Sequence, residues 1–370
     1  SERIAKKLEN FGYAKAKKET GADLIVLNAC SVRQSAINRV YGKIRNLKNK
    51  RIILAGCILK KDKKKLEKIV DEFWHPDEYF DLIPIASNSN TAYIPIMTGC
   101  NNFCTYCAVP YTRGRERSRK AKNIIKEVKT ALKKGVKEIW LLGQNVNSYK
   151  DKNINFAKLL KMINAIPGDF WIRFTSPHPK DFSDDLIKAM AESEKFPHYL
   201  NLPLQSGDDE ILKKMNRPYT VRYYKKLVKK IHKAMPDISI STDIIVGFPG
   251  ETKKQFENTA RAMREIKFDM AYLSEYSPRH GTLAAQKYKD DIPHKEKDLR
   301  KKKLNDILIK TALENNKKLI GKIVKVLNNR TEGNKLIKFR SPTSTQKKSD
   351  FVNRVKVTKA TPWHLEGKLL

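Results

Sequence analysis

Three cysteines lie within eight residues in the first third of the chain. Cys100, Cys104 and Cys107 occur in the run Gly-Cys-Asn-Asn-Phe-Cys-Thr-Tyr-Cys, a C-x3-C-x2-C spacing. A cubane iron–sulfur cluster has four irons, so three thiolates leave one iron open to a substrate or cofactor. Zinc normally takes four ligands, and no second cysteine pair or nearby histidine completes such a set. The spacing therefore predicts an iron–sulfur cluster that binds a reactant, with a zinc knuckle as the alternative.

The other two cysteines, Cys30 and Cys57, each follow a short apolar run rich in β-branched residues. The expected strands are residues 23–28 and 51–55, and the expected helices are residues 33–47 and 61–72. This alternation predicts an open parallel sheet. Ligands of such sheets gather at the carboxyl ends of the strands, so we expect the two cysteines to lie close together and to act as ligands. The alternative is two small buried thiols.

Six further strand-like runs, separated by amphipathic helical patterns, occupy the middle of the chain. They are residues 93–97, 138–142, 171–175, 199–204, 239–246 and 270–276. Six β/α units predict a partial barrel with its chemistry at the carboxyl ends of the strands. The three-cysteine loop directly follows the first of these strands, as that rule requires.

Beyond residue 315, short runs alternate apolar with basic residues. The runs are residues 322–327, 335–339 and 353–357, with turn-rich segments at 328–334 and 341–349. This pattern predicts a small antiparallel β-barrel with a basic exterior. A barrel without a ligand is the alternative.

The composition favours a polyanionic partner. The 370 residues contain 76 Lys and Arg against 40 Asp and Glu, a formal net charge of +36. A distributed positive charge attracts nucleic acid, and a membrane surface is the weaker alternative. No apolar stretch reaches the length of a spanning helix, and five cysteines argue against a disulfide framework, so we expect a reducing cytoplasm.

The cysteine loop also carries a family resemblance. Tyr106 before the last cysteine and the continuation Cys-Ala-Val-Pro-Tyr-Thr-Arg-Gly at 107–114 resemble radical S-adenosylmethionine (SAM) enzymes of the methylthiotransferase branch. The resemblance implies an α/β chain of three domains: an N-terminal open parallel-sheet methylthiotransferase domain (1–90), a radical SAM (β/α)6 partial barrel (91–312) and a small antiparallel TRAM-like RNA-binding barrel (315–370).

The same resemblance implies two [4Fe-4S] clusters. The first, on Cys100, Cys104 and Cys107, would bind SAM, and one electron would cleave SAM to methionine and a 5′-deoxyadenosyl radical. The second, auxiliary cluster would take Cys30, Cys57 and a third cysteine. We expect that cysteine on a strand before Ser1, because a helix that opens an α/β unit normally follows a strand. The segment between Cys57 and Cys100 is short for the family.

Polar residues beside glycine or proline follow the strands of the predicted partial barrel, a composition that suits close approach of backbone to a ligand. By resemblance, Gln144 and Asn145 would lie near the methionyl group of SAM, and Thr175 and Gln205 near its ribose or carboxylate. The segment from Gly247 to Glu251 would lie near the adenine. Arg217 is a candidate carboxylate clamp, because a guanidinium pairs bidentately with a carboxylate.

Within the family, Gly-Gln-Asn-Val-Asn-Ser-Tyr at 143–149 and Arg-Phe-Thr-Ser-Pro-His-Pro at 173–179 most resemble the branch acting on isopentenyladenosine at tRNA position 37. That branch would consume two SAM per product. The branches acting on threonylcarbamoyladenosine and on a ribosomal protein are alternatives, as is a non-catalytic iron–sulfur RNA-binding protein. The implied partners are the anticodon stem-loop of tRNA, an electron donor such as flavodoxin or ferredoxin, and a sulfur source, with the protein a cytoplasmic monomer.

Overall fold

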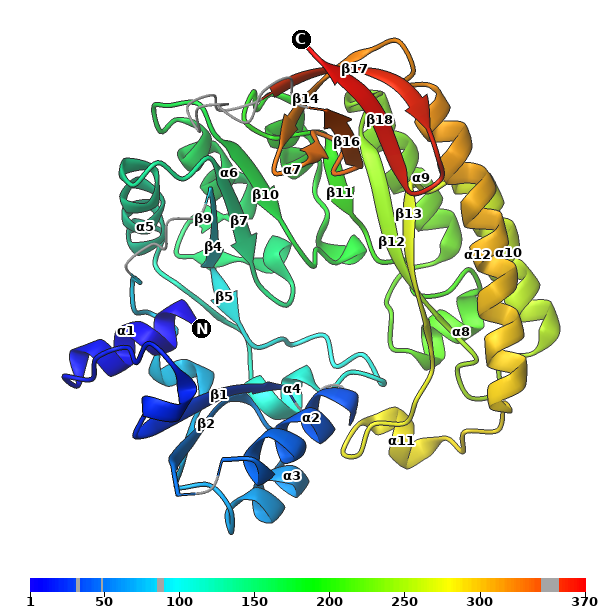
Figure 1. Cartoon of the computed structure of the whole chain (residues 1–370). Helices are drawn as coiled ribbons and strands as arrows, with labels where there is room; N and C mark the ends of the chain where they lie inside the picture. The colour runs from blue at the N-terminus through cyan, green and yellow to red at the C-terminus, as the bar shows by residue number, and fades with distance from the viewer. Residues whose placement is uncertain (31–33, 48, 85–89, 341–352) are drawn as a thin grey trace. The chain divides into compact units, whose positions relative to one another are not determined.

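The structure is a computed structural model that describes residues 1–30, 34–47, 49–84, 90–340 and 353–370 (Figure 1). The chain forms two compact units, each described by itself below. The first unit contains residues 1–89, 97–119 and 278–288, and the second contains residues 90–96, 120–277 and 289–370.

The first unit contains a parallel sheet in the order β1-β2-β3. Its strands are β1 (Leu24–Cys30), β2 (Arg51–Cys57) and β3 (Glu72–Trp74), and its helices include α1 (Glu2–Asn10), α2 (Gln34–Arg45) and α3 (Lys60–Leu66). The open parallel sheet predicted from the sequence is confirmed, and the short strand β3 was not foreseen. Antiparallel strands β5 (Met97–Thr98) and β6 (Arg117–Ser118) flank the three-cysteine loop, and helices α4 (Val109–Arg113) and α11 (Leu283–Lys287) complete the unit.

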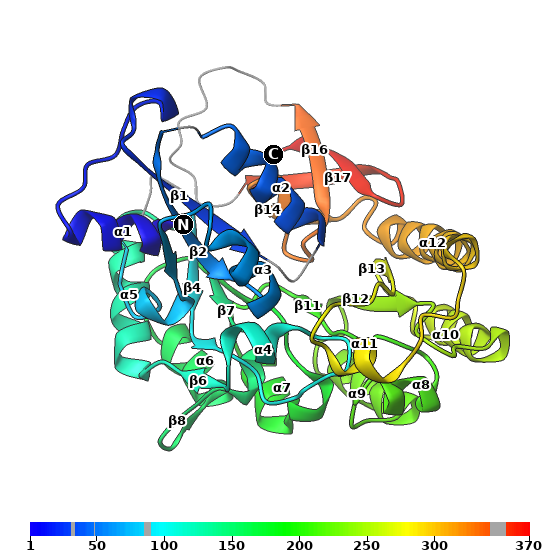
Figure 2. The same ribbon diagram turned by 90° about the horizontal axis from the view of Figure 1, so that it is seen from below.

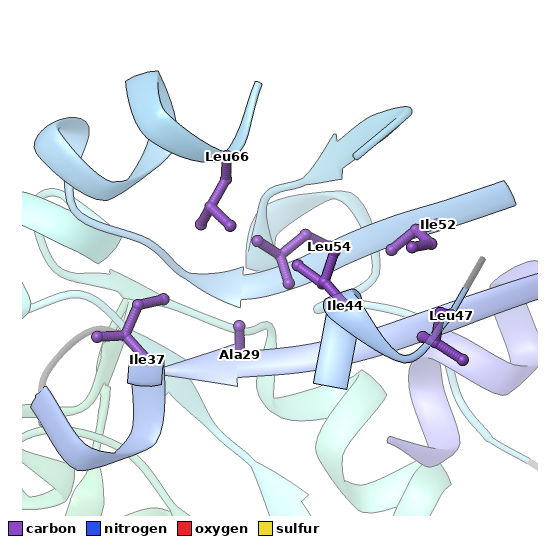
Figure 3. Packing of buried hydrophobic residues seen from close by; sticks show 7 residues of the cluster. All are labelled: Ala29, Ile37, Ile44, Leu47, Ile52, Leu54 and Leu66. Carbon is purple, nitrogen blue, oxygen red and sulfur yellow. The ribbon is translucent and has the colours of Figure 1, made fainter. Parts of the chain in front are cut away.

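Helices cover both faces of this sheet. Alternate residues of β2 point to opposite faces, as strand geometry requires. Ile52 and Leu54 pack with Ile37 and Leu66 of α2 and α3 (Figure 3). Ile53 instead packs, with Ala55, against Ile4 of α1 and Trp74. A sheet buried on both faces needs near-continuous apolar strands, and this explains the Arg-Ile-Ile-Leu-Ala-Gly-Cys sequence of β2.

The helix predicted over residues 61–72 is too long. Helix α3 ends at Leu66, whose carbonyl oxygen accepts hydrogen bonds from the N–H groups of Ile69 and Val70. Asp71 then joins β2, since its side chain accepts a hydrogen bond from Ile52 N–H at 2.6 Å. The apolar spacing of Leu66, Ile69 and Val70 imitates a helix, but it belongs to a tight turn that leads into β3.

In the second unit, all six strands expected in the middle of the chain are confirmed. They are β4 (Thr91–Pro95), β7 (Glu138–Leu142), β10 (Trp171–Phe174), β11 (Tyr199–Asn201), β12 (Ser239–Val246) and β13 (Met270–Glu275). They form two parallel three-stranded sheets, in the orders β4-β7-β10 and β11-β12-β13 (Figure 1). A short hairpin of β8 (Lys150–Asp151) and β9 (Ile154–Asn155) follows β7.

Amphipathic helices separate these strands. They are α5 (Ala121–Lys133), α6 (Phe156–Asn164), α7 (Asp184–Ala191), α8 (Asp209–Lys214), α9 (Val221–Ala234), α10 (Lys253–Ile266) and α12 (His294–Lys317). Side chains of Asn155, Ser183, Asp208, Thr220 and Thr252 cap the first turns of α6 to α10 in that order. Such caps satisfy backbone N–H groups that have no partner inside the helix. Their apolar faces are buried at Ile124 and Val128 of α5 and at Leu186, Ile187 and Met190 of α7.

A small closed barrel follows α12, in the strand order β14-β15-β16-β18-β17 (Figure 2). Its strands are β14 (Ile323–Leu327), β15 (Arg330–Thr331), β16 (Leu336–Arg340), β17 (Asn353–Ala360) and β18 (His364–Leu369). The predicted barrel is confirmed, although β16 and β18 pair in parallel and β18 was not foreseen as a strand. The predicted turn-rich segment 341–349 lies outside the described residues. Val326, Ile337, Val355, Val357 and Leu365 form the barrel core.

A buried arginine joins this barrel to the sheet of β10 within the second unit. Arg173 is 1% exposed, and its Nε donates to Glu138 Oε1 at 2.7 Å. Its two terminal nitrogens donate to the carbonyl oxygens of Glu332 and Thr331 at 3.1 and 3.2 Å. Of the helices described in the chain, none combines the length and the apolar character needed to cross a bilayer.

Candidate functional site

Backbone contacts hold the two ends of the three-cysteine loop together. Cys100 N–H donates to the Gly114 carbonyl oxygen at 3.3 Å. Gly99 lies in the left-handed region at φ +74°, and a Cβ there would collide with the Arg115 carbonyl. Only glycine allows this close approach, so the residue before Cys100 is fixed by loop closure.

The three thiols of the loop differ in exposure. Cys100 is buried, and burial raises the pKa of its thiol, whereas Cys104 and Cys107 are partly exposed. Cys107 N–H donates to the Cys104 carbonyl oxygen at 2.9 Å, which closes a turn between them. Phe103 in the same loop stacks edge-on against Tyr111.

The donor set of the loop suits an iron–sulfur cluster. Thiolates are the ligands that such clusters take, and a cubane carries each of its thiolates on a different iron. Across the residues that the structure describes, no three His, Cys, Asp or Glu side chains are grouped as ligands of a single metal ion. A cubane does not require that convergence, so three thiols on one closed loop fit it.

Cys30 and Cys57 are direct partners at the carboxyl ends of β1 and β2. The expectation that they lie side by side is confirmed. Cys30 is exposed and Cys57 is buried. Gly56, at φ +113°, leaves no room for a Cβ against the Ala29 carbonyl.

The sulfur of Cys57 is bonded by Arg113 and interacts electrostatically with Tyr79. Arg113 Nε, from the last residue of α4, donates to Cys57 Sγ at 2.7 Å. Burial raises the pKa of the Cys57 thiol, and the arginine opposes that rise. Burial, and then the charge of Cys57, raise the pKa of Tyr79 to about 12, so this phenol stays neutral. No pattern in the sequence indicated this group of residues.

In the second unit, the residues after β7 contain buried polar atoms that lack protein partners. Gln144 Oε1 and Asn145 Oδ1 have no hydrogen-bond partner among the described residues. The amide nitrogen of Asn145 is occupied, since it donates to Asp181 Oδ2 at 2.7 Å. A buried polar atom without a partner costs about 1–3 kcal/mol, so both oxygens are candidate ligand contacts.

The residues after β10 and β11 repeat this feature. Thr175 is half-buried, and its N–H continues the ladder to the Leu141 carbonyl. Gln205 has a left-handed backbone at φ +70°, and its Oε1 is also buried without a partner in the described part of the chain. The hydroxyl of Tyr276, just past β13, is likewise buried and has no hydrogen-bond partner among the described residues.

His178 adds a neutral donor that was not in the predicted ligand set. Its Nδ1 accepts a hydrogen bond from Lys180 N–H at 3.2 Å, so the ring proton is on Nε2. Burial, with the charges of Arg217 and Lys180, lowers its pKa to about 2 and keeps the ring neutral. Nε2 is buried and has no partner among the residues described. The Thr-Ser-Pro-His-Pro run at a strand end was the available signal.

Two other residues predicted to contact SAM form hydrogen bonds within the protein instead. Arg217 is buried, with Nε bonded to the Tyr219 hydroxyl at 2.9 Å and a terminal nitrogen bonded to the Pro203 carbonyl at 3.2 Å. Glu251 Oε2 accepts from Gly247 N–H at 2.7 Å and from Arg300 at 2.7 Å. Arg217 thus stabilises the segment before Gln205, and Glu251 stabilises the loop that begins at Gly247. Direct contact of either with SAM stays a prediction.

Comparison with known proteins agrees with this geometry. The radical SAM superfamily model matches residues 94–263, and a model described as "Uncharacterized protein family UPF0004" matches residues 1–74. Among solved structures, the radical SAM methyltransferase TsrM from Kitasatospora setae superposes with a TM-score of 0.50 at 13% identity, over 74% of this chain and 64% of that one. This likeness shows the radical SAM fold.

Curated relatives identify the family more narrowly. The tRNA-2-methylthio-N(6)-dimethylallyladenosine synthase of Clostridium novyi (strain NT) is 42% identical over 426 positions, which cover 100% of this chain and 93% of that protein. The synthase of the same name from Thermoanaerobacter sp. (strain X514) is 40% identical over 100% of this chain and 89% of its own length. The chain therefore belongs to the family of tRNA-2-methylthio-N(6)-dimethylallyladenosine synthases. Because these alignments are longer than the chain's 370 residues, the relatives contain internal segments that this chain lacks.

Proposed function

We propose that the chain is a radical SAM methylthiotransferase that converts C2–H of isopentenylated adenosine at tRNA position 37 into C2–SCH3. The observation that carries this function is the identity of about 40% to synthases of that name over the whole chain. An unactivated aromatic C–H resists acid–base chemistry. When bound, two [4Fe-4S] clusters and SAM supply the one-electron chemistry, the sulfur and the methyl group that the substitution needs.

We assign the cysteines of the first unit to the clusters. Cys100, Cys104 and Cys107 would hold the cluster that leaves one iron open to SAM. Cys30 and Cys57 would provide two ligands of the auxiliary cluster, with a third cysteine in the segment that precedes them in the family. Their adjacency at the ends of β1 and β2 supports this assignment.

The polar strand ends of the second unit would bind SAM. Gln144, Asn145 and Gln205 offer buried carbonyl oxygens that can accept hydrogen bonds from the cofactor, and His178 offers a neutral N–H donor. Thr175 and the Gly247 loop would contribute further contacts, while Arg217 and Glu251 hold their loops in place. Burial of these groups excludes water, which protects a radical from quenching.

The domain bounds 1–90, 91–312 and 315–370 form part of the proposal, with the last as a TRAM-like domain that grips tRNA through phosphates. The charge of +36 supports a polyanionic substrate. We further propose recognition of the anticodon stem-loop, an electron donor such as flavodoxin or ferredoxin, a separate sulfur source, and a monomeric cytoplasmic enzyme.

The test is anaerobic reconstitution with iron and sulfide, followed by dithionite, SAM and isopentenylated tRNA. Mass spectrometry of the digested nucleosides should detect the methylthiolated product, and 5′-deoxyadenosine should be released. Matched tRNA without the isopentenyl group should give no product. Methylthiolation of threonylcarbamoylated tRNA instead would reassign the substrate, and absence of 5′-deoxyadenosine would refute the radical mechanism.

A further inference from the structure

Arg113 connects the two sets of cysteines in the first unit. Helix α4 starts two residues after Cys107 and ends at Arg113, so this arginine is carried by the three-cysteine loop. Its Nε donates to Sγ of Cys57, the last residue of β2, at 2.7 Å. Cys57 is 4% exposed. A charge-assisted hydrogen bond in such a poorly hydrated place is stronger than the same bond in water.

The segment around Arg113 is fixed by contacts on both sides. His75 Nε2 lies 3.2 Å from the carbonyl oxygen of Thr112, the residue before Arg113. Four residues later, Arg117 forms ion pairs of 3.0 Å with both Asp77 and Asp81. These three partners follow β3, so α4 is attached to the same sheet that ends in Cys57. The guanidinium is therefore held at the sulfur by the fold.

We propose that Arg113 is a positioning residue for the auxiliary cluster, which orients the Cys57 sulfur and makes the cluster easier to reduce. The inference rests on the proposed function, because that function supplies the cluster. Reduction adds negative charge to a cluster, and hydrogen bonds and net charge at its sulfurs help to set its potential. A guanidinium bonded to one ligand sulfur stabilises the reduced form more than the oxidised form. Arg113 is only six residues from Cys107, so the loop that would hold the SAM cluster also influences the reduction potential of the auxiliary cluster.

The test measures the auxiliary cluster alone. The protein is reconstituted with the segment that supplies the third auxiliary cysteine, and Cys100, Cys104 and Cys107 are replaced by alanine, so that the auxiliary cluster is the one to be titrated. Its midpoint potential is followed by electron paramagnetic resonance in the parent and in Arg113→Gln, Arg113→Lys and Arg115→Gln. Arg115 is the matched control, because it carries the same charge in the same loop but stacks on Phe103.

We expect Arg113→Gln to lower the equilibrium constant for reduction at least tenfold, which is a shift of 59 mV to a more negative potential for one electron. Arg113→Lys should shift less, and Arg115→Gln should match the parent. Loss of iron from Arg113→Gln, with Arg115→Gln fully loaded, would also support the positioning role. Equal potentials and iron contents in all four proteins would overturn it while leaving the methylthiotransferase assignment intact. A parent without any cluster would refute the auxiliary site, and the inference with it.

Discussion

Replacing Arg173 by methionine should destabilise the second unit and weaken tRNA binding together. The guanidinium is 1% exposed and joins the sheet of β10 to the C-terminal barrel through Glu138, Thr331 and Glu332. Burial lowers the pKa of Arg173 although Glu138 opposes that effect, so removing the arginine from water is costly in itself. The pair persists because each of its charges has bonded partners.

The size of the effect follows from what methionine leaves behind. The carboxylate of Glu138, 8% exposed, would keep the hydroxyl of Thr91 at 3.0 Å but lose its cation. Breaking one side of a buried ion pair costs about 3–5 kcal/mol. Replacing both charges, in Arg173→Met with Glu138→Leu, removes the uncompensated charge and should recover most of that loss.

Urea denaturation of the metal-free single and double variants measures this difference. Filter binding of tRNA, measured in parallel, should show a higher Kd for Arg173→Met, because the barrel loses its buried attachment. SAM cleavage without RNA should change little. If the single variant lost less than about 1 kcal/mol, or if the double variant were the less stable of the two, the reasoning from the buried charge would be wrong.

Four other outcomes are expected. Alanine at any one of the three loop cysteines should abolish 5′-deoxyadenosine release, and full release would refute the open-cluster assignment. In the protein that includes the segment with the third auxiliary cysteine, Cys57→Ala should retain part of the SAM cleavage but make no methylthiolated tRNA; normal product would refute the two-cluster model. Gln205→Leu should raise the Kd for SAM about tenfold in calorimetry, the loss of one hydrogen bond, and an unchanged Kd would remove Gln205 from the SAM site. His178 has a folded pKa of about 2, against an unfolded value of about 6.5, so below pH 6.5 the unfolded state binds a proton that the folded state does not. Stability should therefore fall as pH drops from 6.5, by roughly 1 kcal/mol at pH 5.5, and more gently in His178→Phe.

The fold of this chain could be predicted largely from its sequence, because buried parallel strands leave long apolar runs. All six strands of the middle region and the adjacency of Cys30 and Cys57 follow from that rule. Short elements could not be predicted in the same way. Strand β3 has only three residues, too few for an apolar period to show. Strand β18 has six residues, but only two of them are leucines in His-Leu-Glu-Gly-Lys-Leu, so its apolar pattern is weak.

The candidate site could be predicted by position, but the role of each side chain could not. Arg217 and Glu251 are themselves predicted SAM contacts, yet each forms hydrogen bonds within the protein. A sequence cannot distinguish a charge that meets a ligand from one that stabilises a turn. Conversely, the contact of Arg113 with Cys57 joins residues 56 positions apart, and the neutrality of His178 depends on burial. Both are consequences of tertiary packing.

These bracing contacts also explain why buried atoms in the second unit remain without partners. An unbonded oxygen such as Gln205 Oε1 would normally turn toward the nearest donor, at a gain of about 1 kcal/mol. Arg217 donates hydrogen bonds to Tyr219 and to the carbonyl of Pro203, two residues before Gln205, and Arg300 donates to Glu251. With these cations occupied elsewhere, the proposed binding of SAM to the unbonded atoms would not first have to break an internal bond. In such a preorganised site, the free-energy cost of leaving polar atoms unbonded arises during folding. Each hydrogen bond to a bound cofactor would then add to the binding free energy without a cost for rearranging the protein.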